Sequence, residues 1–384
     1  MKKISILSLH LGYGGIEKSI VSLANILCKK YDVEIAVCYN LYDKCVFDLD
    51  KRVKINYLNP KEIVPNKSKF KKEYLSCHLL KAFKEGLFAL KVLNARKSSV
   101  SNYIKNCSSD VIISTRDIFN EWTGKYARDG VLKIAWEHNH FHGDYHYARK
   151  IVNSVSNMDY LVLVTNELND YYTKELVNSN CRCVCIPNCI ETIPKDISKL
   201  TDKRFISVGR LSKEKGYMDL LKLFNEFQRN NSDWVLDIIG DGSEMDSLKE
   251  YISTNKLDNK VTLHGFQGKD YIEKIMMRSS IYLMTSFTES FGIVLIEAMS
   301  YGIPCIAMDS AEGARDIIED GKNGFLIKNR DYDSMINKMN ELIESYELRS
   351  KMGKNARESI YKYTSDVIGK KWIDLIEKSD TNER

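Results

Sequence analysis

Short apolar runs rich in β-branched residues alternate along the chain with longer stretches of helical periodicity. This alternation predicts parallel α/β layers, because a helix between two strands brings the second strand parallel to the first. The strands predicted in the first half are 2–11, 32–40, 110–116, 131–138, 160–165 and 181–188. Those predicted in the second half are 204–210, 234–242, 260–266, 280–286, 303–309 and 324–327.

Two such series predict two doubly wound domains. A chain of 384 residues is too long for one ordinary core, and the best linker candidate is 187–203, with Pro187 and Pro194. We predict one domain at 1–191 and a second at 192–363. Ligands of such sheets bind beyond the carboxyl ends of the strands, so we expect a site in a cleft between the two domains.

The N-terminus and the cysteines indicate the compartment. The first apolar run is short and leads into "GYGGIEK" rather than a cleavage site, so we expect a strand and not a secretory signal. No stretch reaches the roughly 18 apolar residues of a membrane span. Four of the ten cysteines form C-x-C-x-C-x3-C at 181–189, a spacing that fits neither a zinc finger nor paired CxxC motifs. We therefore expect reduced thiols in a cytoplasmic protein.

Positive charge is concentrated in segment 61–106. The whole chain carries +5, whereas this segment has eleven Lys and Arg against three Glu, which gives +8 (11 − 3). Its apolar residues share one helical face: Leu79, Leu80, Phe83, Leu87 and Leu90. One interpretation is a core-packing helix with a solvated basic side. The other is a helix that lies on an anionic membrane surface or grips a phosphate-rich acceptor. Nucleic acid is not expected, since no binding motif is present.

Several predicted strands end in glycines or cations. Gly12, Gly14 and Gly15 stand between the first strand and a helix, where backbone N–H groups and the helix N-terminus could meet an anion. They lack the third glycine of the GxGxxG fingerprint, so a plain turn remains an alternative. In "VGRLSKEKG", Arg210 and Lys215 could neutralise a diphosphate without a metal, although surface loops are often basic. "GDGSE" and "LHGF" would complete a glycine-rich rim on the same sheet edge.

Four of the seven histidines lie in "AWEHNHFHGDYH": His138, His140, His142 and His146. We favour one histidine that contacts substrate, or a solvated loop, over a metal site, because few acidic residues surround them. The aspartates of "DLD" at 48–50 do not indicate a metal site either. They lead into "KRVKINYL", which we interpret as a surface loop.

Two carboxylates, Glu289 and Glu297, interrupt an otherwise apolar stretch at 287–307. We predict a helix over 290–302, capped by Ser290, whose first turn Gly292 opens to an anion. If the segment is helical throughout, eight residues separate the two carboxylates by about 12 Å along the axis. That exceeds the roughly 5–9.5 Å between the carboxyl groups of a glycoside hydrolase. The spacing fits two grips on one long ligand; the alternative is two structural carboxylates.

The motifs together are similar to those of retaining GT-B glycosyltransferases of glycosyltransferase family 4. "ESFGIVLIEAMSYGIP" resembles the E-x7-E signature of that family. Seven further stretches of this sequence resemble the family's other blocks and come in the family's order. They are "GGIEKSIVSLANIL", "EHN", "IPNCI", "GRLSKEKG", "IGDG", "LHGF" and "EGARDIIEDGKNGFLI". The likeness is greatest to bacterial enzymes that assemble capsule, lipopolysaccharide or lipid-linked oligosaccharide. It implies the GT-B fold, with two Rossmann-like domains facing across a cleft and a last helix, 364–384, that crosses back to the first domain.

The resemblance also implies roles for individual residues. Arg210 and Lys215 would clamp the donor diphosphate without a metal, Glu289 would contact the donor sugar, and Glu297 would bind the ribose. His138 would lie near the reacting sugar. The remaining donor contacts implied are Gly14 and Gly15 beside the phosphates, Gly265 and Phe266 at the base, and the backbone of Phe291, Gly292 and Ile293.

The expected function is retaining, metal-independent hexosyl transfer from a nucleotide sugar, most simply a UDP-sugar, to a glycan or lipid-linked acceptor. Front-face attack is the implied mechanism, in which the departing phosphate helps to deprotonate the acceptor. The alternatives are a UDP-sugar epimerase or hydrolase of GT-B-like fold, and a non-catalytic sugar-nucleotide-binding protein. Cys189 departs from the family's "PNG" glycine, and 41–106 matches no family block, so the acceptor stays open. We expect a cytoplasmic enzyme, peripheral on the inner face of a membrane.

Overall fold

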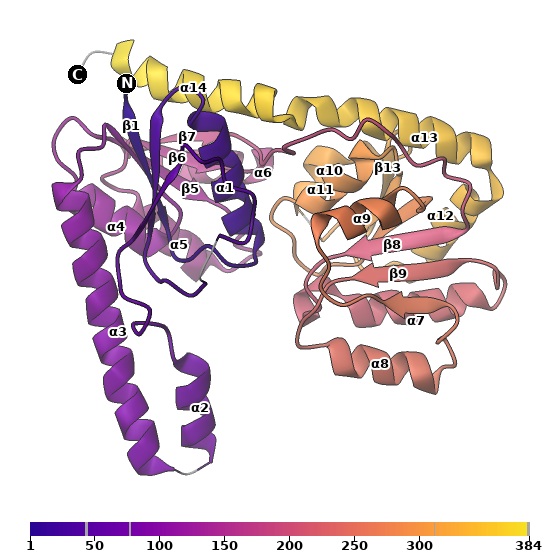
Figure 1. The fold of residues 1–384 in the computed structure, drawn as a ribbon. Coiled ribbons are helices and arrows are strands. Elements are labelled where there is room, and N and C mark those ends of the chain that lie inside the picture. Colours follow the sequence, from indigo (N-terminus) through magenta and orange to yellow (C-terminus); the bar gives the residue numbers. More distant parts are fainter. Residues whose placement is uncertain (43–44, 77, 311, 382–384) are drawn as a thin grey trace. The chain divides into compact units, whose positions relative to one another are not determined.

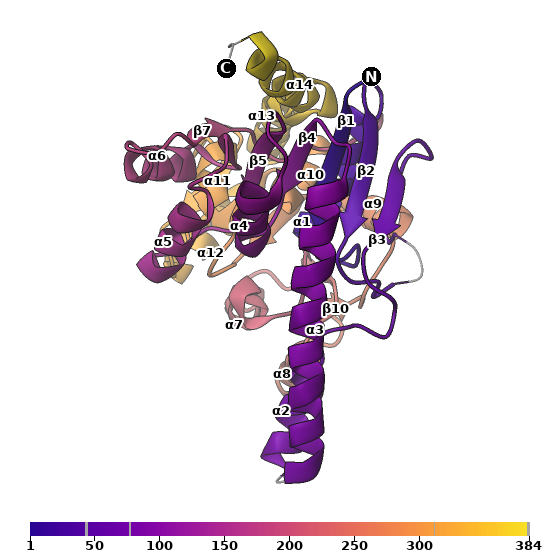
Figure 2. The ribbon, with the colours of Figure 1, turned by 90° about the vertical axis from the view of Figure 1, so that its left-hand side faces the viewer.

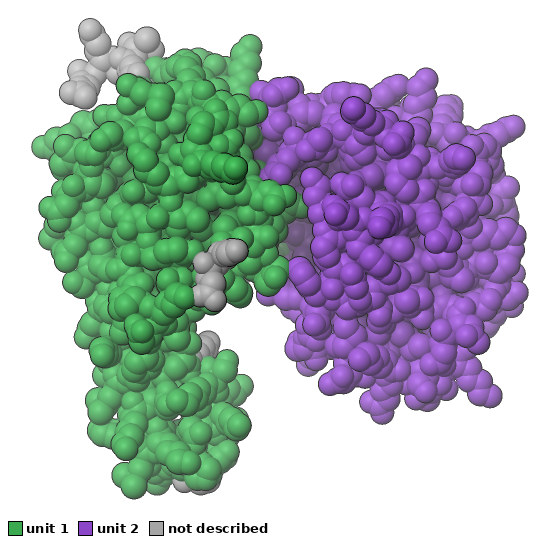
Figure 3. Space-filling view, viewed as in Figure 1, with its two compact units in different colours: residues 1–163, 168–186, 369–384 green, residues 164–167, 187–368 purple. Residues whose placement is uncertain are grey.

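The protein was analysed as a computed structural model that describes residues 1–42, 45–76, 78–310 and 312–381. The chain forms two compact units (Figure 3). Unit 1 comprises 1–163, 168–186 and 369–384, and unit 2 comprises 164–167 and 187–368. The boundary that corresponds to the one predicted between 191 and 192 lies at Ile186/Pro187, five residues earlier. Residues 382–384 of the predicted last helix lie outside the described residues.

Unit 1 is built on a parallel seven-stranded sheet in the order β3-β2-β1-β4-β5-β6-β7 (Figure 1). The predicted α/β class is confirmed here, since every neighbouring pair of strands is parallel. Its strands are β1 (Lys3–Ser8), β2 (Asp32–Val37), β3 (Lys54–Tyr57), β4 (Val111–Ser114), β5 (Leu132–Glu137), β6 (Tyr160–Leu163) and β7 (Arg182–Cys185).

The strand β3 corrects one prediction, because its residues had been interpreted as a surface loop. It is four residues long and pairs with β2 alone, at the edge of the sheet. Its side chains are half-buried or exposed, so the sequence lacks the apolar run that marks the central strands.

The helices of unit 1 lie between and after these strands in the sequence. They are α1 (Gly15–Leu27), α2 (Lys67–Leu75), α3 (Leu79–Asn106), α4 (Asp117–Tyr126), α5 (Tyr145–Ser154), α6 (Asn166–Glu175) and α14 (Ser365–Thr381). One core joins Leu7 and Ile112 of the sheet to α3 and α4. From Gly369 onward, α14 belongs to unit 1, where Trp372 packs edge-on against Trp136 with ring centroids 5.0 Å apart.

Unit 2 repeats the plan with a six-stranded parallel sheet in the order β10-β9-β8-β11-β12-β13. Its strands are β8 (Arg204–Val208), β9 (Val235–Ile239), β10 (Val261–Leu263), β11 (Ile281–Met284), β12 (Cys305–Met308) and β13 (Gly324–Ile327). Its helices are η1 (Lys213–Lys215), α7 (Tyr217–Gln228), α8 (Met245–Thr254), α9 (Lys269–Met276), α10 (Ile293–Ser300), α11 (Glu312–Ile317), α12 (Tyr332–Glu344), α13 (Tyr346–Ser359) and η2 (Ile360–Tyr363).

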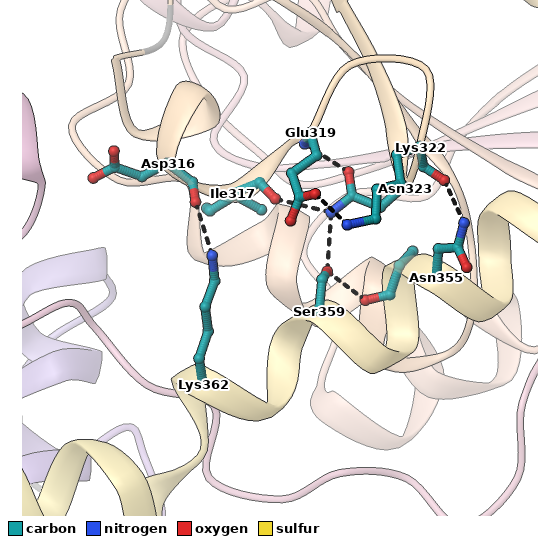
Figure 4. A network of polar contacts seen from close by, with 9 residues as sticks. Asp316, Ile317, Glu319, Lys322, Asn323, Asn355, Ser359 and Lys362 are labelled. Carbon is teal, nitrogen blue, oxygen red and sulfur yellow. Dashed lines mark hydrogen bonds and ion pairs between the residues drawn. The ribbon is translucent and has the colours of Figure 1, made fainter.

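A buried polar network closes unit 2 beside α13 (Figure 4). Asn323, which is 1% exposed, accepts from the Glu319 N–H at 2.8 Å. Its amide donates to the Ile317 carbonyl at 3.1 Å and to Ser359 Oγ at 3.0 Å. The loop before β13 is thus fastened to the helix that covers it.

The thiols and the helix lengths complete the description. Every cysteine that the structure describes is a free thiol, whereas Cys77 lies outside the described residues. Within the described ranges, no helix combines the length and the apolar character that crossing a bilayer requires.

Candidate active site

Both sheets reverse their strand order at a switch point, which is where doubly wound folds hold ligands. In unit 2 this point lies between the neighbouring strands β8 and β11. The loops that leave their carboxyl ends run through 209–216 and 285–292. These loops contain five of the residues predicted to bind donor: Arg210, Lys215, Glu289, Phe291 and Gly292.

The two loops meet through an ion pair between Lys215 and Glu289. Both side chains are mostly shielded, at 22% and 18% exposure. Two hydrogen bonds fix the approach: the Phe287 N–H donates to the Glu214 carbonyl at 2.8 Å, and Thr285 Oγ1 donates to the Gly216 carbonyl at 2.9 Å. The pair therefore lies at the switch point between two loops that are held together by hydrogen bonds. It presents one cation and one carboxylate there.

Gly216 is required for this approach. Its φ of 66° lies in the left-handed region, and a Cβ there would lie 2.2 Å from the Thr285 carbonyl oxygen. A side chain would push the two loops apart and separate Lys215 from Glu289.

The glycine-containing loops of the predicted rim do adjoin on one edge of the sheet. The Gly209 N–H donates to the Ile239 carbonyl at 2.9 Å, and the Gly240 N–H donates to the Gly265 carbonyl at 2.9 Å. The loops after β8, β9 and β10 therefore form a continuous edge. Arg210 lies exposed on this edge, and Phe266 is 56% exposed at its far end.

The helix α10 corrects the prediction for 290–302. It begins at Ile293, and its N-cap is Gly292 in the left-handed region (φ 88°, ψ 52°), so Ser290 is not the cap. Residues 289–292 are not helical, and the estimate of about 12 Å between Glu289 and Glu297 loses its premise. Glycine at the cap has a conformational reason, because the left-handed region disfavours side chains.

The other residues predicted to contact the donor differ in the exposure of their side chains. The ring of Phe291 is 2% exposed and packs edge-on against Tyr363, so its backbone rather than its side chain can serve a ligand. Ile293 and Glu297 are half-buried on α10. A hollow of about 410 Å³ opens next to Gly216 and Phe287. Neither Lys215 nor Glu289 lines it.

The switch point of unit 1, between β1 and β4, holds a cluster that the sequence analysis missed. Glu17, 4% exposed in the first turn of α1, lies 3.5 Å from His10 Nδ1 and 3.7 Å from an Arg116 nitrogen. Burial lowers the pKa of His10, and the charge of Glu17 opposes that shift. The available signal was that His10 and Arg116 both lie at the carboxyl ends of predicted strands, 2–11 and 110–116, which meet at one sheet edge.

The predicted glycines border this cluster. Gly14 is the N-cap of α1, and a Cβ there would lie 2.0 Å from a Glu17 carboxylate oxygen. A Cβ at Gly15 would meet nothing within 4 Å. Gly14 therefore leaves room for the buried Glu17, while Gly15 leaves its backbone N–H open at the start of the helix.

His138 follows β5 and is buried, with its ring 4.2 Å from that of Trp136. Burial lowers its pKa to about 3, and the charge of Arg116 acts in the same direction. His138 is therefore neutral at physiological pH. Its Nε2 is buried and has no hydrogen-bond partner in the described part of the chain. A neutral histidine with an unused nitrogen fits a group that hydrogen-bonds a hydroxyl.

The neighbouring histidines divide into two kinds. His140 is buried and its Nδ1 accepts from the His142 N–H at 2.8 Å, whereas His142 and His146 are exposed. A wholly solvated loop is therefore wrong for His138 and His140. Across the residues that the structure covers, no three His, Cys, Asp or Glu side chains are grouped so as to hold a metal ion.

Comparisons with known proteins agree with this architecture. Residues 190–359 match the family described as "Glycosyl transferases group 1". The chain is 26% identical over 383 residues to an uncharacterized glycosyltransferase of Haemophilus influenzae, covering 98% of this chain and all of that one. It is 28% identical over 250 residues to lipopolysaccharide 1,6-galactosyltransferase of Salmonella typhimurium, covering 63% of this chain and 68% of that one.

A solved structure shows the same fold. A mutant of TarM from S. aureus, in complex with fondaparinux, alpha-GlcNAc-glycerol and UDP, superposes with a TM-score of 0.77 at 17% identity, covering 98% of this chain and all of that chain. The predicted GT-B fold class is confirmed by such neighbours. The chain is a glycosyltransferase.

Proposed function

We propose that this glycosyltransferase moves a hexose, with retention of anomeric configuration and without a metal, from a UDP-sugar to a glycan or lipid-linked acceptor in bacterial polysaccharide or glycolipid synthesis. The observation that carries the proposal is the Lys215–Glu289 pair at the switch point of unit 2. A cation and a carboxylate side by side, at the edge where such sheets hold nucleotides, support a role for Lys215 at the diphosphate and for Glu289 at the sugar hydroxyls.

Each donor group has a matching protein group. Arg210 and Lys215 would neutralise the diphosphate and stabilise it as it leaves, which is the task a metal performs in other sites. Glu289 would orient the sugar, and the N-terminus of α10 would offer backbone N–H groups to the phosphates. The glycine-rich rim ending at Gly265 and Phe266 would border the base, and Glu297 would bind the ribose.

The transfer itself would proceed by front-face attack. The acceptor oxygen bonds to the anomeric carbon as the bond from that carbon to the phosphate oxygen breaks. The acceptor proton passes to the departing diphosphate, and His138, neutral in unit 1, would contact the sugar. Glu289 forms no covalent intermediate in this scheme.

The donor preference is supported by a fold neighbour bound to UDP, and the acceptor class by the galactosyltransferase relative that acts on lipopolysaccharide. Thermal-shift screening with UDP-, GDP-, ADP- and dTDP-sugars, followed by a panel of lipid-linked acceptors, tests both. Stabilisation by UDP-sugars and a product with the donor's anomeric configuration support the proposal. Conversion of UDP-sugar to another sugar nucleotide without an acceptor would indicate an epimerase, and binding with no turnover a non-catalytic protein.

A further inference from the structure

The helices α2 and α3 form a hairpin whose outer part lies away from the sheet of unit 1 (Figures 1 and 2). From about its middle onward, α3 enters the core through Val92, Val100 and Ile104, and Phe88 packs against that core. Six large apolar residues between positions 79 and 93 do not join it. Cys77, in the turn between the helices, lies outside the described residues.

These apolar side chains face solvent. Leu80 is 82% exposed, Leu79 71% and Phe83 67%, and Leu87, Leu90 and Leu93 are also exposed. At about 100° per residue these six fall within an arc of roughly 140° on α3. Val92, on the opposite side, and Ala82, at one edge of the arc, are buried. The core-packing interpretation of this face is therefore wrong, because the residues expected to pack inward are the exposed ones.

The same hairpin carries unbalanced positive charge. Its acidic residues already have partners: Glu85 pairs with Lys69 at 2.6 Å, and Glu73 with His78 at 2.9 Å. Five further lysines are exposed and form no ion pair with any described residue: Lys71, Lys72, Lys81, Lys84 and Lys91. Lys84 and Lys91 are seven residues apart and both lie along one edge of the apolar arc, so charge and apolar surface adjoin.

We propose that the α2–α3 hairpin docks on an anionic lipid membrane, with the Leu79–Leu93 face in the headgroup and acyl boundary and the lysines on lipid phosphates. An apolar stripe bordered by lysines is the pattern of helices that lie in a membrane interface. Stacked Phe70 and Tyr74, with ring centroids 6.2 Å apart on α2, add aromatic side chains of the kind that gather at that depth.

Charge decides between a membrane and a second copy of this chain. Two hairpins that pack face to face would bring together two segments of net +8 each, and like charges repel. Anionic lipid attracts the same lysines. Lys84 and Lys91 border the apolar arc, and no described helix can span a bilayer, so the hairpin would lie on the surface.

Co-sedimentation of the full chain with phosphatidylcholine vesicles, with and without phosphatidylglycerol, at low and high salt, tests this docking. We expect binding only to the phosphatidylglycerol vesicles and release at high salt. Lys84→Gln with Lys91→Gln should weaken partitioning on the order of 25-fold, since each surface lysine contributes roughly fivefold. The control pair Lys351→Gln and Lys354→Gln, exposed on α13, should bind as the unaltered chain does.

Insertion of the apolar face into the membrane is tested by a second set of variants. Leu79→Ser with Leu80→Ser should reduce binding at low salt without lowering the melting temperature, because both side chains are already exposed. Val177→Ser, at 77% exposure elsewhere in unit 1, is the matched control. In Leu87→Trp, the new indole should be quenched by lipids brominated on the acyl chain. The native tryptophans, all 7% exposed or less, should not be.

Three results would overturn the inference. They are no sedimentation with anionic vesicles at low salt, equal binding to neutral vesicles that the lysine changes do not affect, and a dimer in analytical ultracentrifugation that the leucine changes abolish. None of these measurements needs donor or acceptor. The membrane docking is therefore tested independently of the proposed transfer reaction.

Discussion

Lys215 and Glu289 are 74 residues apart in the sequence and form an ion pair at the switch point of unit 2. Each comes from a loop that follows a central strand, and the two loops are joined by a backbone hydrogen bond and by one from the Thr285 side chain to the Gly216 carbonyl. A pair held this way loses little side-chain freedom when a ligand arrives, so it is organised before binding.

Arg210→Ala should weaken donor binding and also slow turnover at saturation, because this cation would hold the diphosphate and stabilise it as it leaves. Arg210 is exposed on the same sheet edge as the pair, and a hydrogen bond to a charged group is worth roughly 1.5–3 kcal/mol, or about 10- to 100-fold in kcat/KM for the donor. Initial-rate kinetics with varied donor measure the effect. Lys222→Ala, an exposed cation on α7, is the control. Undiminished donor affinity in Arg210→Ala would remove this residue from the diphosphate clamp.

Gly292→Ala should destabilise unit 2 by about 1–2 kcal/mol, because its φ of 88° costs a side chain that much. Activity should fall as well, since the added Cβ and the strain both act at the entry to α10. Asn tolerates the left-handed region better, so Gly292→Asn should recover part of the stability. Denaturant unfolding of the unaltered chain, Gly292→Asn and Gly292→Ala should rank their free energies of unfolding in that order. Equal stability of the Ala and Asn variants would contradict the conformational explanation.

Glu137 should give stability a pH dependence. Burial raises the pKa of this carboxyl to about 7, although the Asn139 N–H at 2.7 Å and the Tyr147 hydroxyl at 3.1 Å hydrogen-bond it. Between about pH 4.5 and 7 the folded state then holds a proton that the unfolded state has lost. Stability from this group is therefore complete below pH 4.5 and is lost as pH rises toward 7, on the order of 3 kcal/mol.

The comparison with Glu137→Gln isolates that group. His138, whose pKa is lowered to about 3, acts in the opposite sense, because its stability is lost as pH falls from about 6.5 toward 3. Both proteins share the His138 contribution. The stability of Glu137→Gln relative to the unaltered chain should therefore increase from pH 4.5 to 7.5 in urea unfolding. A constant difference across that range would show that Glu137 titrates normally.

Asn323→Ala should destabilise unit 2 by roughly 2–4 kcal/mol, because it leaves buried partners without hydrogen bonds (Figure 4). Asn355→Ala, which removes one bond of 2.9 Å to the Lys322 carbonyl nearer the surface, should cost no more than about 1 kcal/mol. Thermal melting compares the two. A larger loss for Asn355→Ala would contradict the burial argument.

The sequence predicts those parts of the fold that depend on local pattern. Buried central strands are continuous apolar runs, so twelve of the thirteen strands that the structure describes were predicted. The edge strand β3 was not, since half-buried residues carry no such signal. The start of α10 was misplaced because Ser290 has the chemistry of a cap, whereas the backbone turns at Gly292.

The candidate site shows the same limit. Lys215 and Glu289 were chosen one by one from their motifs, but only the strand order brings them into contact. The cluster of His10, Glu17 and Arg116 depends on β1 lying beside β4, which no local window contains. The exposure of the leucines on α3 was also open, since an amphipathic pattern does not say what covers its apolar face.

The turnover of Glu289→Gln with the donor identified in the screen tests the central claim most directly. The substitution keeps the shape and removes the charge, and the exposed Glu250→Gln on α8 is its control. Because the cations would hold the diphosphate and Glu289 the sugar, affinity for UDP alone should persist while kcat falls on the order of 100-fold or more. Near-normal kcat in Glu289→Gln would contradict the charged role of this residue and the account built on its pair with Lys215.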